Sequence, residues 1–176
     1  MPAARFVEQL NAQIGNELFA HNQYLAIAAF YDGLTMPQMA AFFYAQAAEE
    51  REHGLMMVQY LLDTDSPVEI PGVEGPVVGF DDVLAPVELA LRQEQTVTEQ
   101  INALLRTARE EFDFASEQFM QWFVKEQVEE VALMGDLLNV AERSKDNLLL
   151  AEEYIARESF GEEGNDPTAP PPAGGN

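Results

Sequence analysis

The chain has 176 residues, which is one domain's worth, and its hydrophobic fraction of 47% suffices for a buried core. The formal net charge of -22 argues against nucleic acid or anionic membranes as partners and favours the attraction of cations. The absence of cysteine excludes disulfides, iron–sulfur clusters and rubredoxin-type iron centres.

Four long helices are predicted, because apolar residues recur at alternating steps of four and three over residues 4–31, 37–63, 82–109 and 112–142. The first helix has a charged, amphipathic start rather than a signal peptide, and it ends near Gly33. Thr35 and Pro37 predict the start of the second helix, with a capping hydroxyl and an early proline. The short gap between these helices predicts an antiparallel pair.

A link rich in glycine and proline follows, from about residue 63 to residue 80. It is long enough to span a helix of about 40 Å, so it permits the second and third helices to be parallel. Asp81 or Asp82 is expected to cap the third helix, and Val77–Val78 could pair with a second copy as a short strand. The third and fourth helices turn back near residues 111–113.

Two segments follow the bundle. Residues 146–159 predict a short fifth helix, too small to be stable alone. Residues 161–176 hold glycine and proline without apolar periodicity, so we expect one domain over residues 1–160 and a disordered or loosely draped tail on which folding depends little. No apolar stretch has transmembrane length, and a soluble cytoplasmic protein is expected.

The apolar seam of each long helix becomes polar near its midpoint. A midpoint stays at mid-depth whichever way its helix points, so the polar side chains of the four seams should meet in one layer of an all-α bundle. These side chains are Glu17, Glu50, His53, Glu94, Gln127 and Glu130.

Such a layer predicts a metal site. Any one of these glutamates could be an ordinary solvated residue of an acidic protein, but that reading does not account for all of them at one depth. Buried, unpaired carboxylates cost several kcal/mol each and repel one another. None of the nine Lys and Arg residues lies on a seam, so divalent cations are the simplest way to neutralise the charge of these carboxylates. Carboxylates with one imidazole and no thiolate suit iron, manganese or zinc, and the few protein ligands leave open positions for chemistry.

The spacing of these residues, with Tyr24 one heptad after Glu17, resembles the ferritin family, and more narrowly the bacterial non-haem ferritins, over roughly residues 4–160. The resemblance implies a four-helix bundle with a long crossover between the second and third helices and a short fifth helix. It further implies a homo-oligomeric shell of twenty-four subunits. Each subunit would oxidise Fe(II) with O₂ or H₂O₂ at a centre for two irons, and the shell would store Fe(III) as a mineral.

Residue roles also follow from the resemblance. Glu17, Glu50 and His53 would bind one iron, Glu50 would bridge the pair, Glu94 and Glu130 would bind the second iron, and Gln127 would lie beside them. Members of this family have a third iron site nearby, to which Glu49, Glu126 and Glu129 correspond; a solvated acidic face is the alternative for these three. Tyr24 would be a redox-active neighbour or a plain core aromatic.

Two departures separate the chain from haem-containing bacterioferritins. Arg51 stands where those proteins place the methionine that binds haem, and Glu130 stands where they repeat a histidine, so no haem is expected. A rubrerythrin-like peroxide reductase or another carboxylate-bridged oxidase would usually carry that second histidine motif. A purely structural bundle remains the third hypothesis, and the midpoint carboxylates count against it.

Overall fold

A computed structural model describes residues 1–158 and 166–174 of the chain. Its five helices are α1 (Ala4–Gly33), α2 (Pro37–Asp63), α3 (Ala85–Glu110), α4 (Phe114–Arg143) and α5 (Leu149–Glu158). No strand occurs among these residues, which confirms the predicted all-α class and the order of four long helices and one short one.

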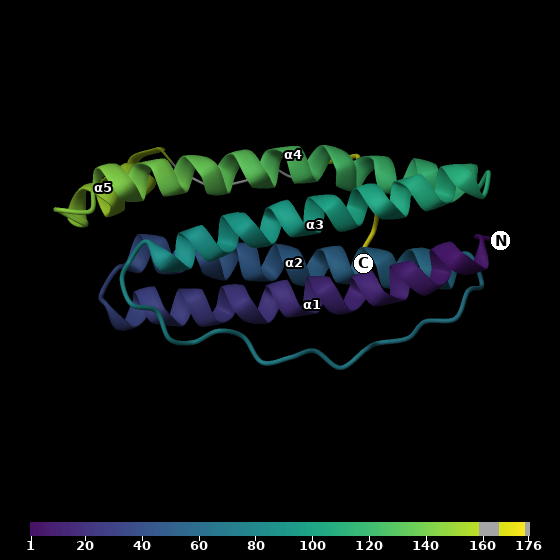
Figure 1. Ribbon diagram of the computed structural model, residues 1–176, viewed down its shortest axis with the longest axis horizontal. Coiled ribbons are helices and arrows are strands. Elements are labelled where there is room, and N and C mark those ends of the chain that lie inside the picture. Colours follow the sequence, from purple (N-terminus) through teal and green to yellow (C-terminus); the bar gives the residue numbers. More distant parts are fainter. Residues whose placement is uncertain (159–165, 175–176) are drawn as a thin grey trace.

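The crossover decides the direction of the helices. Figure 1 shows it running the whole length of the bundle, from the end of α2 to the start of α3. α2 and α3 are therefore parallel to each other and antiparallel to α1 and α4, an arrangement that the length of the link permits. α5 packs against α2 and α4 at the far end of the bundle.

Two helices begin later than the sequence suggested. α3 begins at Ala85 rather than residue 82, because Oδ1 of Asp82 accepts hydrogen bonds from the N–H groups of Leu84 at 2.8 Å and Ala85 at 2.9 Å. α4 begins at Phe114 rather than residue 112, since Asp113 caps it. The predicted cap by Asp81 or Asp82 is not borne out, because the N-cap position of α3 is Leu84 and no side chain caps it; Asp82 lies two residues earlier and bonds to the turn that leads into the helix.

The predicted cap of α2 is wrong. Thr35 lies in the left-handed region, with a φ of 60°, and no side chain at the N-cap position bonds to the helix. Glu152 of α5 does this instead: its two carboxylate oxygens accept the N–H groups of Gln38 at 2.8 Å and Met39 at 2.9 Å. A carboxylate at a helix N-terminus is stabilising, so α5 and α2 support each other.

Amide side chains of α1 hold the crossover in place. Asn11 bonds to the crossover backbone at Pro67 and Glu69, and Gln23 bonds to both the N–H and the C=O of Val77. A Cβ on Gly15 would lie 2.5 Å from a Pro71 ring carbon, so glycine allows the crossover to approach α1. Pairing of Val77–Val78 with a second copy stays a prediction.

The hydrophobic core consists of two clusters with a polar layer between them. The first cluster ends at Tyr24, Ala47, Ala90 and Met134 on the four helices. The second begins on the other side of the layer, at Ile14, Met56, Val97 and Phe123. All six midpoint residues of the predicted layer fall between these limits, each at most 5% exposed.

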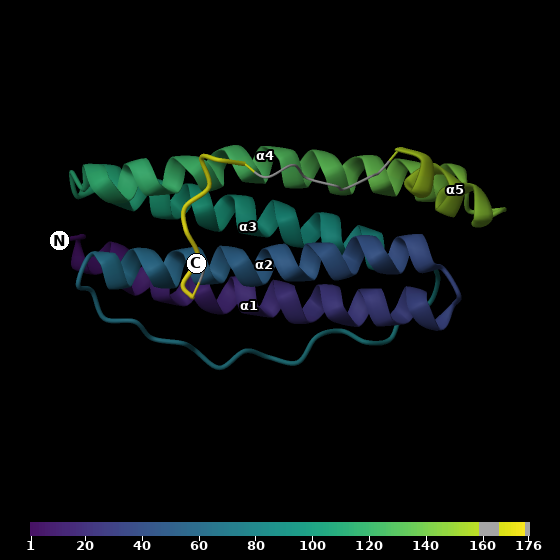
Figure 2. The same ribbon diagram turned by 180° about the vertical axis from the view of Figure 1, so that it is seen from behind.

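The described part of the tail follows a definite path. Figure 2 shows residues 166–174 crossing from α4 to α2, where the N–H of Ala173 donates to the carbonyl of Leu55 at 3.0 Å. Ala169 packs against the second hydrophobic cluster. Residues 161–165, 175 and 176 lie outside the described residues, so the expected disorder of the tail concerns them and stays a prediction there.

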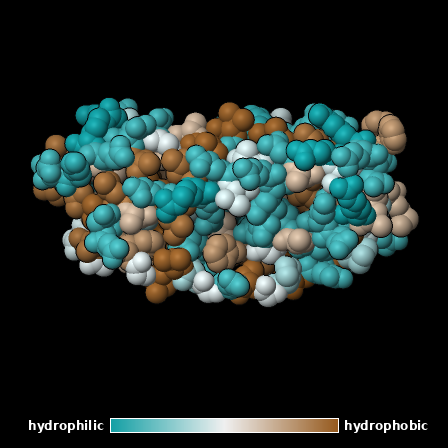
Figure 3. Space-filling model, viewed as in Figure 1, coloured by the Kyte–Doolittle hydropathy of each residue, from teal (hydrophilic) through white to brown (hydrophobic). Residues whose placement is uncertain are grey.

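The surface combines charged residues with isolated apolar ones. Figure 3 shows hydrophobic residues along the edge that carries the crossover, where Ile70, Val77 and Val78 are exposed. Within the described chain, no helix has both the length and the apolar character that a bilayer-spanning segment needs.

Candidate metal centre

Three ligand-type side chains converge between α1 and α2. The ligand atoms of Glu17, Glu50 and His53 lie within 4.8 Å of one another, and all three residues are buried. Nδ1 of His53 is 3.6 Å from Oε2 of Glu50, which is too long for a hydrogen bond. Oε2 of Glu17 and Oε2 of Glu50 are buried and have no hydrogen-bond partner. Such a set of anionic oxygens and one imidazole fits a divalent cation.

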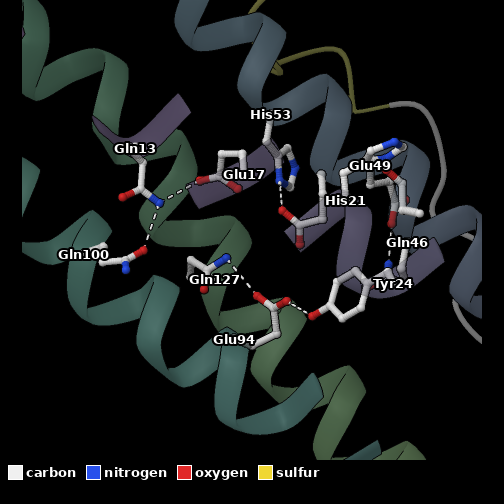
Figure 4. A network of polar contacts seen from close by, with 12 residues as sticks. Gln13, Glu17, His21, Tyr24, Gln46, Glu49, His53, Glu94, Gln100 and Gln127 are labelled. Atoms are coloured by element: carbon white, nitrogen blue, oxygen red, sulfur yellow. Dashed lines mark hydrogen bonds and ion pairs between the residues drawn. The ribbon is translucent and has the colours of Figure 1, made fainter. Parts of the chain in front are cut away.

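The other half of the layer comes from α3 and α4. Glu94 is fully buried and accepts hydrogen bonds from the Tyr24 hydroxyl and, at 3.3 Å, from Nε2 of Gln127. Glu130 is 1% exposed and interacts electrostatically with Glu50 and with Tyr24. Figure 4 shows Glu94 and Gln127 facing Glu17 and His53 across the interior of the bundle, with the Tyr24 hydroxyl of α1 pointing toward Glu94.

Burial and mutual repulsion make the layer electrostatically unusual. Burial raises the pKa of Glu50 well above its usual value, and the charges of Glu94, Glu17 and Glu130 add to this rise. Burial also raises the pKa of Glu94 to about 7. Burial and then the negative charge of Glu94 raise the pKa of Tyr24, so its phenol stays protonated at neutral pH. A cation in the layer would offset the repulsion and favour the ionised carboxylates.

A sequence model of the ferritin-like domain matches residues 7–144. The chain belongs to the ferritin family. This match confirms the family that the ligand spacing suggested.

Relatives of known name are also ferritins. This ferritin is 52% identical over 171 residues to ferritin BfrB of Mycolicibacterium smegmatis, covering 97% of this chain and 94% of the relative. It is 36% identical to a bacterial non-heme ferritin of Staphylococcus aureus, covering 93% of this chain and 100% of the relative. An open-pore ferritin of Archaeoglobus fulgidus superposes with a TM-score of 0.84 at 28% identity, covering 92% and 99% of the two chains.

The residues suggested for a third iron site are not equivalent in this ferritin. Glu126 is buried, and Glu49 is half-buried and accepts a hydrogen bond from Gln46. Glu129 is exposed, with its Oε1 3.3 Å from the ammonium of Lys125. A third site built from these residues stays a prediction. Arg51 is exposed on α2.

Two polar residues that bond to the layer escaped the sequence analysis. Gln13 donates to Oε1 of Glu17 at 2.9 Å, and the Thr98 hydroxyl donates to Oε1 of Gln127 at 2.9 Å. Gln13 precedes Glu17 by four residues and Thr98 follows Glu94 by four, and residues four apart are neighbours on a helix. A search for polar residues four positions from each ligand would have found both.

Trp122 and the tail lie beside His53. The indole ring packs edge-on against His53, with ring centroids 5.6 Å apart. Its Nε1 donates to Oδ2 of Asp166 at 3.2 Å, and the Lys125 ammonium bonds to the same oxygen at 3.1 Å. Hydrogen bonds from Thr168, then from Lys125 and Trp122, hold the pKa of Asp166 well below its usual range.

Proposed function

We propose that this ferritin is an iron-storage protein with ferroxidase activity, which oxidises Fe(II) and retains Fe(III) as a mineral inside an oligomeric shell. The observation that carries the proposal is the buried convergence of Glu17, Glu50 and His53, faced by Glu94 and Glu130 in the same layer. A purely structural bundle would gain nothing from this layer, since unpaired buried carboxylates are costly.

The chemistry requires two Fe(II) ions close enough to react with one O₂ molecule. Glu17 and His53 would hold the first ion, Glu94 and Glu130 the second, and Glu50 would bridge the pair. Each Fe(II) loses one electron, and the oxidant, O₂ or H₂O₂, accepts both. Because carboxylates are hard anions, they stabilise Fe(III) more than Fe(II) and so favour oxidation.

Neighbouring residues have secondary roles in this proposal. Gln127 donates to Glu94 through its amide nitrogen, and Tyr24 donates to the same carboxylate, so both would orient Glu94. Tyr24 would also be a redox-active neighbour of the centre. Glu49, Glu126 and Glu129 would form a third iron site on the flank of α2 and α4. Haem has no role, because Arg51 offers no lone pair to its iron.

Storage also requires a closed assembly, which we propose to be a homo-oligomer of twenty-four subunits in the cytoplasm. The exposed Ile70, Val77 and Val78 of the crossover support burial against a second copy. A native mass measurement tests this, and a monomer or dimer as the largest species would contradict the shell.

The ferroxidase activity is tested by mixing metal-free protein with two Fe(II) per chain in air and following absorbance of the ferric product. Wild-type protein should oxidise iron far faster than buffer. Glu50→Ala and His53→Ala should abolish most of the fast phase, whereas Glu99→Gln, an exposed change on α3, should retain it. A wild-type rate equal to that of buffer would refute the activity.

A further inference from the structure

Gln13 is an interior amide of α1 that bonds directly to Glu17, one residue of the triad Glu17, Glu50 and His53. It is 3% exposed and lies one turn before Glu17. Its Nε2 donates to Oε1 of Glu17 at 2.9 Å and to Oε1 of Gln100 at 3.1 Å, as Figure 4 shows.

The orientation of this amide is fixed from several sides. Its oxygen accepts a hydrogen bond from Nδ2 of Asn16 at 2.9 Å, while its nitrogen serves Glu17 and Gln100. A flipped amide would set oxygen against the carboxylate of Glu17 and nitrogen against the donor of Asn16. Asn16 and Gln100 both line a groove of about 290 Å³ between α1 and α3, so Gln13 is anchored from the outer side of the bundle.

This bond makes the two oxygens of Glu17 inequivalent. Oε1 is engaged by Gln13, whereas Oε2 is buried and without a hydrogen-bond partner. Oε2 can therefore bind a cation without competing with a hydrogen bond, whereas Oε1 cannot. A hydrogen bond to one carboxylate oxygen restrains rotation about the last side-chain bond and so defines the direction of the other oxygen.

We infer that Gln13 is a positioning residue that presents Glu17 as a one-oxygen ligand to the first metal of the centre. The inference rests on the proposed metal centre. A different set of bonds serves the second metal: the Thr98 hydroxyl shares its proton between the main-chain carbonyl of Glu94 at 2.8 Å and Oε1 of Gln127 at 2.9 Å, and the amide nitrogen of Gln127 donates to the Glu94 carboxylate. Because the two chains of hydrogen bonds end on different carboxylates, Glu17 and Glu94, loss of Gln13 should affect the first metal directly and the second only through Glu50, which contacts both carboxylates.

Anaerobic titration of the metal-free protein with Co(II), followed by visible absorption, tests this through binding rather than turnover. Gln13→Met keeps the length of the side chain and removes both hydrogen-bonding functions. It should weaken one of two cobalt sites by about 10–100-fold, in the range found for partners of metal ligands, and weaken the other much less. Thr98→Val should weaken the opposite site, and Gln100→Met, which keeps the bond from Gln13 to Glu17, should change the first site less.

Three results would overturn the inference. Wild-type protein that binds no cobalt would remove the proposed centre itself. Two wild-type sites that are unchanged in Gln13→Met would leave the centre standing and refute the role of Gln13. Equal weakening of both sites, together with a lower unfolding temperature, would assign Gln13 a general structural role.

Discussion

At the residue scale, the protonation of Glu94 affects the stability of the metal-free protein. Its pKa of about 7 in the fold lies above the ordinary value of 4.5, and burial is the main cause. Between these two values the unfolded chain is ionised at this residue while the folded chain holds a proton. The contribution of Glu94 to the stability of the metal-free fold is therefore fully present below about pH 4.5, and it is lost, by an amount of the order of 3 kcal/mol, as the pH rises to about 7.

We accordingly expect metal-free protein to unfold at a lower temperature at pH 8 than at pH 5.5, with Glu50 adding to the effect. Glu94→Gln removes the charge at nearly constant volume, so it should raise the unfolding temperature at pH 8 and flatten the pH dependence while weakening cobalt binding. Calorimetry in the presence of a chelator measures this, with Glu99→Gln as the exposed control on the same helix. A variant less stable than wild type at pH 8 would contradict the account.

Gly15 gives a second prediction at this scale. Alanine is the better helix former by about 1 kcal/mol, but at this position its Cβ would meet Pro71 at 2.5 Å and force the crossover away from α1. Gly15→Ala should lower the free energy of unfolding by about 1–3 kcal/mol. Gly135→Ala in α4, where no atom lies within 4 Å of the new Cβ, should raise it by about 0.5–1 kcal/mol. Denaturant unfolding compares the two variants. If both substitutions changed the free energy of unfolding in the same direction, the close contact between Gly15 and Pro71 would be contradicted.

At the scale of elements, α5 and α2 stabilise each other through one carboxylate. α5 has only ten residues and would not be stable alone, and α2 lacks a capping side chain of its own. Glu152 supplies the missing acceptors at the start of α2 and is itself only 9% exposed. The short helix is thus tied to the bundle by a polar contact as well as by Ile155, which packs in the first hydrophobic cluster.

Glu152→Ala should therefore lower the free energy of unfolding by about 1–2 kcal/mol, as expected for the loss of a helix cap. Glu153→Ala changes the exposed neighbour and should have little effect. Chemical denaturation followed by circular dichroism distinguishes them. Indistinguishable midpoints for the two variants would mean that the cap contributes nothing to stability.

At the scale of the whole molecule, the last described residues lie over the ligand layer. Residues 166–174 join α4 to α2 through Asp166 and Ala173, close to the only tryptophan of the chain, Trp122. The bundle does not need this segment to complete its apolar core, apart from Ala169. The segment instead covers an edge where Trp122 contacts His53.

Ending the chain after residue 165 should leave the helical content and oligomeric mass unchanged but expose the indole. We expect the fluorescence emission of Trp122 to shift to longer wavelength, because its Nε1 would exchange Asp166 for water. Asp166→Asn, which keeps an acceptor but removes the charge that attracts Lys125, should give a smaller shift. An emission spectrum unaltered by the truncation would show that the tail does not rest on Trp122 in solution.

The sequence by itself determined the features that depend on local periodicity. Steps of three and four residues define the buried face of each helix, so they predicted the four long helices and the shared depth of Glu17, Glu50, Glu94 and Glu130. The length of the crossover permitted α2 and α3 to be parallel. Only the tertiary structure decided the contacts between distant segments: Glu152 at the start of α2, Asp166 on Trp122, and Gln100 on Gln13. Hydrogen-bond partners far apart in the chain leave no periodic signal, because folding in three dimensions is what brings them together.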